Sequence, residues 1–226
     1  MSEKYLIAID GPAGAGKSTI AKMIAGKLGY VYLDTGAMYR AVTTIALEKG
    51  IADDGNAVIE LAKNIELELT FENGVTKVFV NGEEITDRIR TPEVNAKVSD
   101  ISRIPEVRKE MVRIQKKMGE DGSLVSEGRD TTTVVFPNAD LKIFLTASLD
   151  ERAKRRYLEY KEKGVETTLE EVKKSIENRD HIDSTRKVSP LKKAENAFEI
   201  DSTDMKIEKE IEVILKKLDK LDDRSN

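Results

Sequence analysis

The sequence predicts an α/β fold built on a parallel sheet of about five strands, with helices on both sides of the sheet. Two observations predict this fold. Short apolar runs of strand length alternate along the chain with longer helical patterns, and strands joined through helices favour parallel pairing. The first run, residues 4–10, is almost continuously apolar, which is typical of a strand buried on both faces.

The elements of the core follow one another in a regular order. We expect strands at residues 4–10, 30–34, 123–127, 141–145 and 198–201. We expect helices at residues 17–28, 36–48, 56–64, 92–118 with an interruption near Pro105, 150–163, 168–178 and 204–218. The last helix carries Ile207, Ile211, Ile214 and Leu218 at the spacing of one buried stripe.

A segment between residues 65 and 91 has a different pattern. Residues 65–71 and 75–80 alternate apolar and polar side chains, and Asn73-Gly74 between them is a strong hairpin signal. Asn81-Gly82 marks a second turn. We therefore expect a small antiparallel insert outside the main core, with one face toward water.

The composition excludes several kinds of chemistry. The chain has no cysteine and one histidine, so thiol nucleophiles, Cys-based zinc sites and iron–sulfur clusters are excluded, and His181 is the one histidine available as a general base. No apolar run is long enough to span a membrane, and we expect a cytoplasmic protein. The net charge of -4 argues against nonspecific binding to nucleic acid.

A phosphate-binding motif follows the first strand. Residues 11–18 fit G-x-x-x-x-G-K-[ST] and lie between a buried strand and a helix, which distinguishes them from a glycine-rich turn that only connects the two. The motif predicts a P-loop NTPase-type fold in which backbone N–H groups surround the phosphates of ATP. Lys17 can bridge the β- and γ-phosphates, and Ser18 can ligate Mg²⁺. The expected ATP-binding residues are Gly11, Pro12, Ala13, Gly14, Ala15, Gly16, Lys17, Ser18 and Thr19.

The motif alone does not identify the reaction. The chain has no Asn-Lys-x-Asp sequence for guanine, and the run Leu124–Glu127 does not end in the Asp-Glu pair of ATPase motors. Glu127 is either close to the metal ion or a strand-end carboxylate paired with an arginine, and the sequence leaves both open.

Several arginines lie near expected loops or element ends, where a parallel sheet places its ligand crevice. They are Arg40, Arg108, Arg129, Arg179 and Arg186. Arginine is suited to bidentate contacts with phosphate and to neutralising a phosphoryl group in transfer. Residues 179–186 combine cations and carboxylates in a stretch that we expect to be a mobile, loop-like lid.

Five blocks of the chain resemble bacterial cytidylate kinases, within the nucleoside-monophosphate kinase family, and the resemblance covers nearly the whole chain. The blocks are residues 9–19, Leu33-Asp-Thr-Gly-Ala-Met-Tyr-Arg40, Gly128-Arg-Asp-Thr-Thr-Thr-Val-Val-Phe-Pro137, residues 142–148, and Arg179-Asp with Asp183 and Arg186. The second and third blocks are much more specific than the P-loop. The third departs from the family at Thr131-Thr132-Thr133, where Met-Gly or Ile-Gly is more familiar, and Thr35 stands where serine is common.

The resemblance implies Mg²⁺- and ATP-dependent phosphorylation of CMP and dCMP by a monomer that binds neither nucleic acid nor membrane. It implies a CMP site made of Thr35, Arg40, Ser99, Arg108, Arg129, Asp130, Arg179, Asp183 and Arg186. It implies that Lys17, Arg129, Arg179 and Arg186 act in catalysis. Arg152 and Arg156, at i and i+4, resemble arginines on the ATP side, although a solvated helix face is the alternative.

The same resemblance divides the chain. Residues 1–64 would form the first half of the core with the P-loop, and 65–91 the insert of the nucleotide-acceptor region. Residues 92–148 would add acceptor-binding helices and core strands, 149–192 the lid, and 193–226 the last strand and helix.

The implied reaction explains why one histidine suffices. The nucleophile, a phosphate oxygen of CMP, is already ionised at neutral pH, so positioning and charge neutralisation replace a general base. We therefore expect His181 to be a solvated lid residue. Two alternatives stay open at this point: another P-loop kinase acting on UMP, AMP or shikimate, and a P-loop binding protein, for example with RNA.

Overall fold

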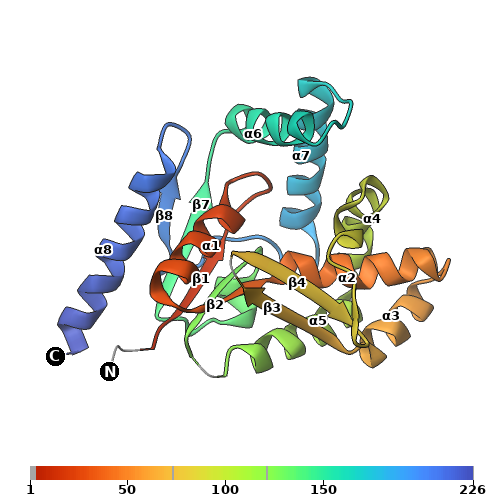
Figure 1. The fold of residues 1–226 in the computed structure, drawn as a ribbon, viewed down its shortest axis with the longest axis horizontal. Helices are drawn as coiled ribbons and strands as arrows, with labels where there is room; N and C mark the ends of the chain where they lie inside the picture. Colours follow the sequence, from red (N-terminus) through yellow and green to blue (C-terminus); the bar gives the residue numbers. More distant parts are fainter. Residues whose placement is uncertain (1–3, 73, 121, 226) are drawn as a thin grey trace.

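The computed structural model describes residues 4–72, 74–120 and 122–225. Its main sheet has five strands, all parallel, in the order β2-β6-β1-β7-β8 (Figure 1). The strands are β1 (Leu6–Asp10), β2 (Val31–Asp34), β6 (Leu124–Gly128), β7 (Leu141–Thr146) and β8 (Phe198–Asp201). The predicted α/β fold with a five-stranded parallel sheet is confirmed.

Helices cover the sheet, and α6 and α7 extend beyond the edge at which β1 and β7 end (Figure 1). The helices are α1 (Lys17–Leu28), α2 (Thr35–Glu48), α3 (Gly55–Asn64), α4 (Pro92–Ser102), α5 (Pro105–Met118), α6 (Leu149–Glu162), α7 (Leu169–Thr185) and α8 (Ile207–Ser225), with short helical turns at Arg88–Arg90 and Thr131–Val135. The break near Pro105 is confirmed because proline opens α5. α8 runs past its predicted end at residue 218.

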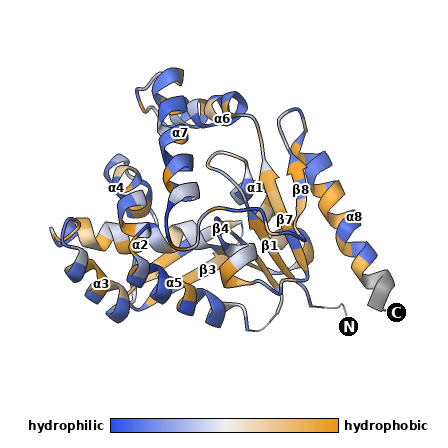
Figure 2. Cartoon of the chain, turned by 180° about the vertical axis from the view of Figure 1, so that it is seen from behind, coloured by the Kyte–Doolittle hydropathy of each residue, from blue (hydrophilic) through white to orange (hydrophobic). Residues whose placement is uncertain are grey.

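The central strand supplies both apolar cores. Ile7 and Ile9 of β1 lie in a core with side chains of α1 and α8. Ala8, which points to the opposite face, lies in a core with side chains of α2, α3 and α5. Seen from behind, the strands are mainly hydrophobic and α6 and α7 are mainly hydrophilic (Figure 2). The sheet is therefore buried on both faces, as the unbroken apolar run of the first strand predicts.

The insert forms an antiparallel sheet of three strands, β3 (Leu67–Glu72), β4 (Val75–Val80) and β5 (Glu83–Glu84). The hairpin is as predicted, although Asn73 of its turn lies outside the described residues. β5 was not predicted because two residues are too short to show alternation. The expectation that the insert lies outside the main core is wrong, since Val78, Val80 and Ile85 are buried in the same core as residues of α2.

The end of α7 also differs from the prediction. The helix does not stop at residue 178 but continues to Thr185, so residues 179–185 of the expected lid loop form its last turns. A capping box at Thr168 begins the helix. The helical spacing places Arg179 and Asp183 at i and i+4 on one face, where they form an ion pair. The stretch that was expected to be a loop is therefore helical up to Thr185.

Among the described residues, no helix has the length and apolar character needed to cross a membrane.

Two glycines give a matched test of this fold. A Cβ on Gly11, the residue after β1, would lie 1.9 Å from the carbonyl oxygen of Leu145 in β7, whereas a Cβ on Gly26 in α1 meets nothing within 4 Å. Gly11→Ala should lower the free energy of unfolding by about 1–3 kcal/mol or more through overpacking. Gly26→Ala should raise it by about 0.5–1 kcal/mol, because alanine is the better helix former. Urea unfolding of both variants measures this, and equal stability of the Gly11 variant and the wild type would contradict the close approach of the two strands.

Candidate active site

A cavity of about 770 Å³ lies at the carboxyl edge of the sheet. It is bounded by the loop after β1, the start of α2, the segment after β6 and the end of α7, as the switch-point rule for parallel sheets predicts. The predicted site residues that line it are Gly14, Ala15, Gly16, Lys17, Ser18, Thr19, Thr35, Arg40, Arg108, Arg129, Asp130, Arg156, Arg179, Asp183 and Arg186. Gly11, Pro12, Ala13, Ser99 and Arg152 are not among its lining residues.

The loop between β1 and α1 has the shape of a phosphate cradle. Gly14 and Gly16 have φ angles of 77° and 92°, which favour glycine and turn the backbone around the start of α1. Lys17 is buried and its Nζ donates a hydrogen bond of 2.7 Å to the carbonyl oxygen of Pro12. The lysine therefore lies across its own loop, at the positive end of the α1 dipole.

Burial and neighbouring cations perturb Lys17 strongly. Burial, with the positive charge of Arg129 next, lowers the pKa of Lys17 to about 7, although Glu127 and Asp10 oppose the shift. Burial is the main cause of the low pKa of Lys17, and the positive charges of Arg129 and Arg179 add to it. A phosphate bound in the cradle would compensate for that charge.

Glu127, at the end of β6, contacts the P-loop helix. The Ser18 hydroxyl donates a hydrogen bond of 2.7 Å to Oε1 of Glu127, and the Tyr32 hydroxyl lies 3.3 Å from the same oxygen. Of the two interpretations that the sequence left open, an ion pair with an arginine is not seen among the described residues, where the salt bridges of the site involve other carboxylates. Serine and carboxylate oxygens together are the hard ligands that Mg²⁺ accepts.

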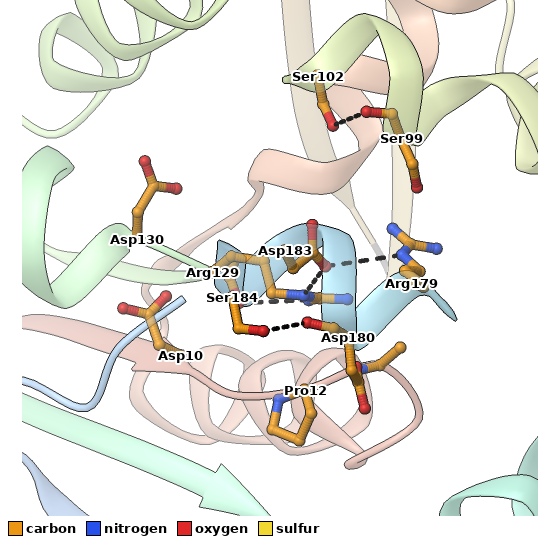
Figure 3. Close-up of polar contacts among 12 residues, drawn as sticks. Asp10, Pro12, Ser99, Ser102, Arg129, Asp130, Arg179, Asp180, Asp183 and Ser184 are labelled. Atoms are coloured by element: carbon orange, nitrogen blue, oxygen red, sulfur yellow. Dashed lines mark hydrogen bonds and ion pairs between the residues drawn. The ribbon is translucent and has the colours of Figure 1, made fainter. Parts of the chain in front are cut away.

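Three arginines converge on Asp183 near the end of α7. The Nε of Arg129 donates to its carboxylate at 2.9 Å, and Nε of Arg179 lies at 3.9 Å (Figure 3). Nη1 of Arg186 lies 3.3 Å from the same carboxylate. Burial alone would raise the pKa of Asp183, but the charges of these arginines outweigh it and lower that pKa. Asp183 therefore stays ionised and holds the three cations together.

A second buried pair lies beside this cluster. Nη2 of Arg108 donates to Asp130 at 2.6 Å, Nη1 donates to the carbonyl oxygen of Ser102 at 3.0 Å, and the guanidinium lies 5.0 Å from the ring centroid of Tyr39. Arg108 is only 2 % exposed, so these contacts hold it firmly. Asp130 also lies 4.0 Å from Arg186, which joins the pair to the cluster around Asp183.

Not all of this positive charge is neutralised. Arg40 is buried, forms no ion pair within the described part of the chain, and its Nε has no hydrogen-bond partner there. Burial lowers the pKa of Arg40, and burial together with the charges of Arg129 and Arg40 lowers the pKa of Arg179 to about 9. Because buried donors are almost always satisfied, these cations indicate an anionic ligand.

The structure separates the two arginines expected on the ATP side. Arg152 is buried, and its Nη1 donates to the Ala13 carbonyl oxygen at 3.0 Å and to Asp180, whose carboxylate also accepts the Ala13 N–H at 3.0 Å. Arg152 therefore joins α6 and α7 to the P-loop, and a solvated face is wrong for it. Arg156 lines the cavity and pairs with Glu159 at 3.0 Å.

Other residues of the neighbourhood are placed differently from the sequence expectation. Ser99 lies in an adjacent groove between α4, α6 and α7, while Ser102, one turn further along α4, lines the main cavity. His181 is exposed and does not line the cavity, as expected.

Sequence reasoning missed Asp34, Tyr39, Arg90 and Arg155, which also line the cavity. Asp34 caps α2 through the Ala37 N–H at 2.8 Å and accepts Arg90 at 3.0 Å. Because Asp34 lies between an expected strand and an expected helix, the sequence could have indicated it as a helix cap at the edge of the sheet. Arg90 reaches the site from the far end of the insert, and no local pattern indicates this.

The parallel sheet, the P-loop and a second group of cations facing it across one cavity define the chain as a P-loop phosphotransferase. The comparisons with known proteins give the family. The family model described as cytidylate kinase matches residues 7–220, so the chain belongs to the cytidylate kinase family.

Individual relatives agree with the family model. The chain is 51 % identical to the cytidylate kinase of Geobacillus sp. (strain WCH70) over 216 residues, which cover 95 % of this chain and 96 % of the relative. It is 47 % identical to the cytidylate kinase of Bacillus thuringiensis (strain Al Hakam) over the same shares. A crystal structure of an uncharacterized protein from Eubacterium ventriosum ATCC 27560 has a TM-score of 0.51 at 13 % identity, covering 96 % of this chain and 99 % of that one, and this similarity concerns the fold alone.

The perturbed lysine predicts a pH dependence of stability. Between pH 7 and 10.5 an unfolded Lys17 keeps a proton that the folded one has lost, so the unfolded state binds more protons and stability rises with pH. The unfolding free energy of the wild type minus that of Lys17→Met should therefore increase from pH 7.5 to 8.5, by up to about 1.4 kcal/mol. Urea titrations in phosphate-free buffer measure it. A difference that stays flat or shrinks over this range would contradict the low pKa of Lys17.

Proposed function

We propose that this protein transfers the γ-phosphoryl group of ATP to the phosphate of CMP or dCMP, forming ADP and CDP or dCDP. One observation carries the proposal beyond family membership. A single cavity holds two cationic groups, the Lys17 cradle and the arginines around Asp183, as two phosphates that face each other require. A site for one nucleotide would need only the first group.

The donor side of this proposal is the P-loop. Its backbone N–H groups and Lys17 bind the β- and γ-phosphates, and the nucleotide restores the charge of the lysine as it binds. Arg155 and Arg156 on α6 line the same cavity. The cavity continues from the P-loop to Met205 and to Ile207, the first residue of α8. Arg152 contributes indirectly by holding Ala13 in place.

The acceptor side is the arginine cluster. Arg40, Arg129 and Arg179 are the cations best placed for the phosphate of CMP, because Arg40 has no carboxylate partner within the described residues and Arg179 is only weakly paired. Asp130 suits the base. Its carboxylate accepts hydrogen bonds, and cytosine presents an amine where uracil presents a carbonyl oxygen. Asp130 therefore favours cytosine over uracil.

The chemistry in this proposal needs no proton acceptor. An ionised oxygen of the acceptor phosphate attacks the γ-phosphorus, a new P–O bond forms, and the bond from the γ-phosphorus to the bridging oxygen of ADP breaks. Lys17, Arg129, Arg179 and Arg186 hold both phosphates in line and stabilise the charge that spreads over the oxygens in transfer. The exposed His181 has no part in this step.

Mg²⁺ belongs to the proposal as the metal that ATP brings. No cluster of three or more His, Cys, Asp or Glu side chains able to hold a metal is found among the described residues. This fits Mg²⁺, which binds proteins through one or two oxygens and takes its other ligands from phosphates and water. Ser18 and Glu127 would hold it, and when bound it neutralises phosphate charge.

The helices α6 and α7 complete the proposal as a lid. The contact of Asp180 and Arg152 with Ala13 joins the lid to the P-loop, and closure excludes water that would otherwise hydrolyse ATP. The division into core, insert, acceptor-binding and lid segments belongs to the same proposal, as do a monomeric state and action in the cytoplasm.

A coupled assay of ADP formation tests the proposed substrate. With Mg²⁺-ATP, we expect CMP and dCMP to be phosphorylated at least about a hundredfold more efficiently than AMP, UMP or shikimate, in the range that a site built for substrate hydrogen bonds can reach. The comparison is made on kcat/KM, with a reaction lacking Mg²⁺ as control. A clear preference for AMP or shikimate would overturn the proposal.

The acceptor cations have their own test in Arg129→Ala. Removing a positioned cation should lower kcat with CMP by about 10²–10³-fold, as the loss of other transition-state donors does. Asp183 keeps Arg179 and Arg186, so the thermal midpoint should change little. Arg113→Ala is the matched control, since that arginine is exposed and pairs only with Glu110. Wild-type turnover of the Arg129 variant would remove this residue from the site.

A further inference from the structure

A buried aspartate connects the two halves of the cavity. Asp10 is the last residue of β1, directly before the P-loop, and it is 0 % exposed. Its carboxylate accepts four hydrogen bonds, all from one dipeptide. Oδ1 accepts the N–H of Thr131 at 2.9 Å and its hydroxyl at 2.7 Å, and Oδ2 accepts the N–H of Thr132 at 2.7 Å and its hydroxyl at 2.6 Å.

The dipeptide follows the acceptor-side residues immediately. Arg129 holds Asp183 at 2.9 Å, and Asp130 holds Arg108 at 2.6 Å. Asp10 thus fixes the backbone that directly follows Arg129 and Asp130. Figure 3 shows Asp10 on β1 and Asp130 on the segment after β6. A small shift of the dipeptide would therefore move the two side chains together.

The hydroxyl groups distinguish this contact from a simple backbone turn. Any residue at 131 and 132 offers its N–H to Asp10, but only serine or threonine adds a hydroxyl. The third threonine behaves differently, because the Thr133 hydroxyl is buried and has no hydrogen-bond partner among the described residues. Two of the three threonines that depart from the family pattern thus complete the four acceptor sites of one carboxylate.

We propose that Asp10 is a positioning residue which, through the hydroxyl groups of Thr131 and Thr132, holds Arg129 and Asp130 in the geometry that binds the phosphoryl acceptor. The proposal rests on the proposed function, in which these two residues bind CMP. It assigns Asp10 no contact with substrate. Burial raises the pKa of Asp10, and the hydrogen bonds from Thr131 and Thr132 act against that shift. Loss of the two hydroxyls therefore removes two of the four hydrogen bonds to the carboxylate and loosens the segment after β6, while the residues of the P-loop stay the same.

The test compares two double variants at residues 131 and 132 with one single variant at residue 133. Thr131→Val with Thr132→Val keeps the side-chain shape and both N–H donors but removes both hydroxyls. Thr131→Ser with Thr132→Ser keeps the hydroxyls and should restore wild-type behaviour. Thr133→Val is the matched control, because it removes a hydroxyl that has no partner in the described residues. None of these changes alters Asp10, whose direct replacement risks the fold.

We expect the double valine variant to raise the KM for CMP between about tenfold and a hundredfold, with the KM for ATP within twofold of wild type, as a misplaced binding group does. Amide hydrogen exchange of residues 128–135 should become faster in this variant and stay unchanged in Thr133→Val. The exchange measurement needs no substrate, so it reports on the contact even if the chain prefers another acceptor.

Three outcomes would overturn the proposal. In the first, the double valine variant shows faster exchange or a lower thermal midpoint, but its KM for CMP and its kcat are unchanged when measured well below that midpoint. This outcome indicates a purely structural contact. The second is an equal rise in the KM for ATP and for CMP, and the third is failure of the serine variant to restore the KM. A wild type inactive toward CMP contradicts the proposed function instead, and the same KM comparison is then made with the acceptor that it does phosphorylate.

As a second variant, Asp10→Asn keeps the size of the side chain but replaces an acceptor with an amide. In either orientation the amide N–H₂ would face a backbone N–H, that of Thr131 or that of Thr132, and a backbone N–H cannot rotate away as a hydroxyl can. The KM for CMP should therefore rise at least as far as in the double valine variant. A wild-type KM for CMP in folded Asp10→Asn would count against a positioning role.

Discussion

The site depends on burying more arginine charge than the carboxylates of the protein neutralise. Asp183 alone faces three arginines, and Arg40 has no ion-pair partner in the described chain. Buried cations are costly unless they are paired, so this arrangement is stable only because a few carboxylates divide the charge between them. Burial first, and the neighbouring arginines second, lower the pKa of Lys17 and of Arg179, and bound phosphate groups would oppose both shifts.

The parallel sheet provides a stable framework for this concentration of charge. Its strands are buried on both faces and end at one edge, so residues that directly follow β1, β2 and β6 meet there without long loops. Rigid elements then fix each side chain. Arg108 is held by Asp130 and Ser102, Thr35 donates to the Glu127 carbonyl oxygen at 2.7 Å, and Asp34 caps α2.

The contact between Asp10 and Thr131-Thr132 joins the end of β1, directly before the P-loop, to the segment that carries Arg129 and Asp130. The P-loop begins directly after Asp10, and the segment that follows Arg129 donates hydrogen bonds to the Asp10 side chain. On the opposite side of the loop, Asp180 and Arg152 hold both the N–H and the carbonyl oxygen of Ala13. The loop between β1 and α1 is thus held by the segment after β6 on one side and by α6 and α7 on the other, which suits the alignment that the proposed reaction needs.

Much of the site could be predicted where the signal is local. The P-loop, the strand-end arginines and the order of strands follow from short patterns, and the structure places most of the predicted residues around one cavity. Prediction was weaker where the partner is distant in sequence. Residues 179–185 were predicted as a loop because Asp180 and Asp183 pair with arginines far away in the sequence, Arg152 and Arg129. Arg90 is 56 residues from Asp34, with which it pairs.

The sequence by itself determined the class of fold, the phosphate-binding loop and the kinds of side chain available for chemistry, because periodicity, glycine spacing and residue type are local properties. Only the tertiary structure decided which arginines are neutralised, that Arg152 supports the P-loop and does not line the cavity, and that the insert shares the main core. Burial and ion pairing depend on segments that meet in space after folding, and no local pattern encodes those distances.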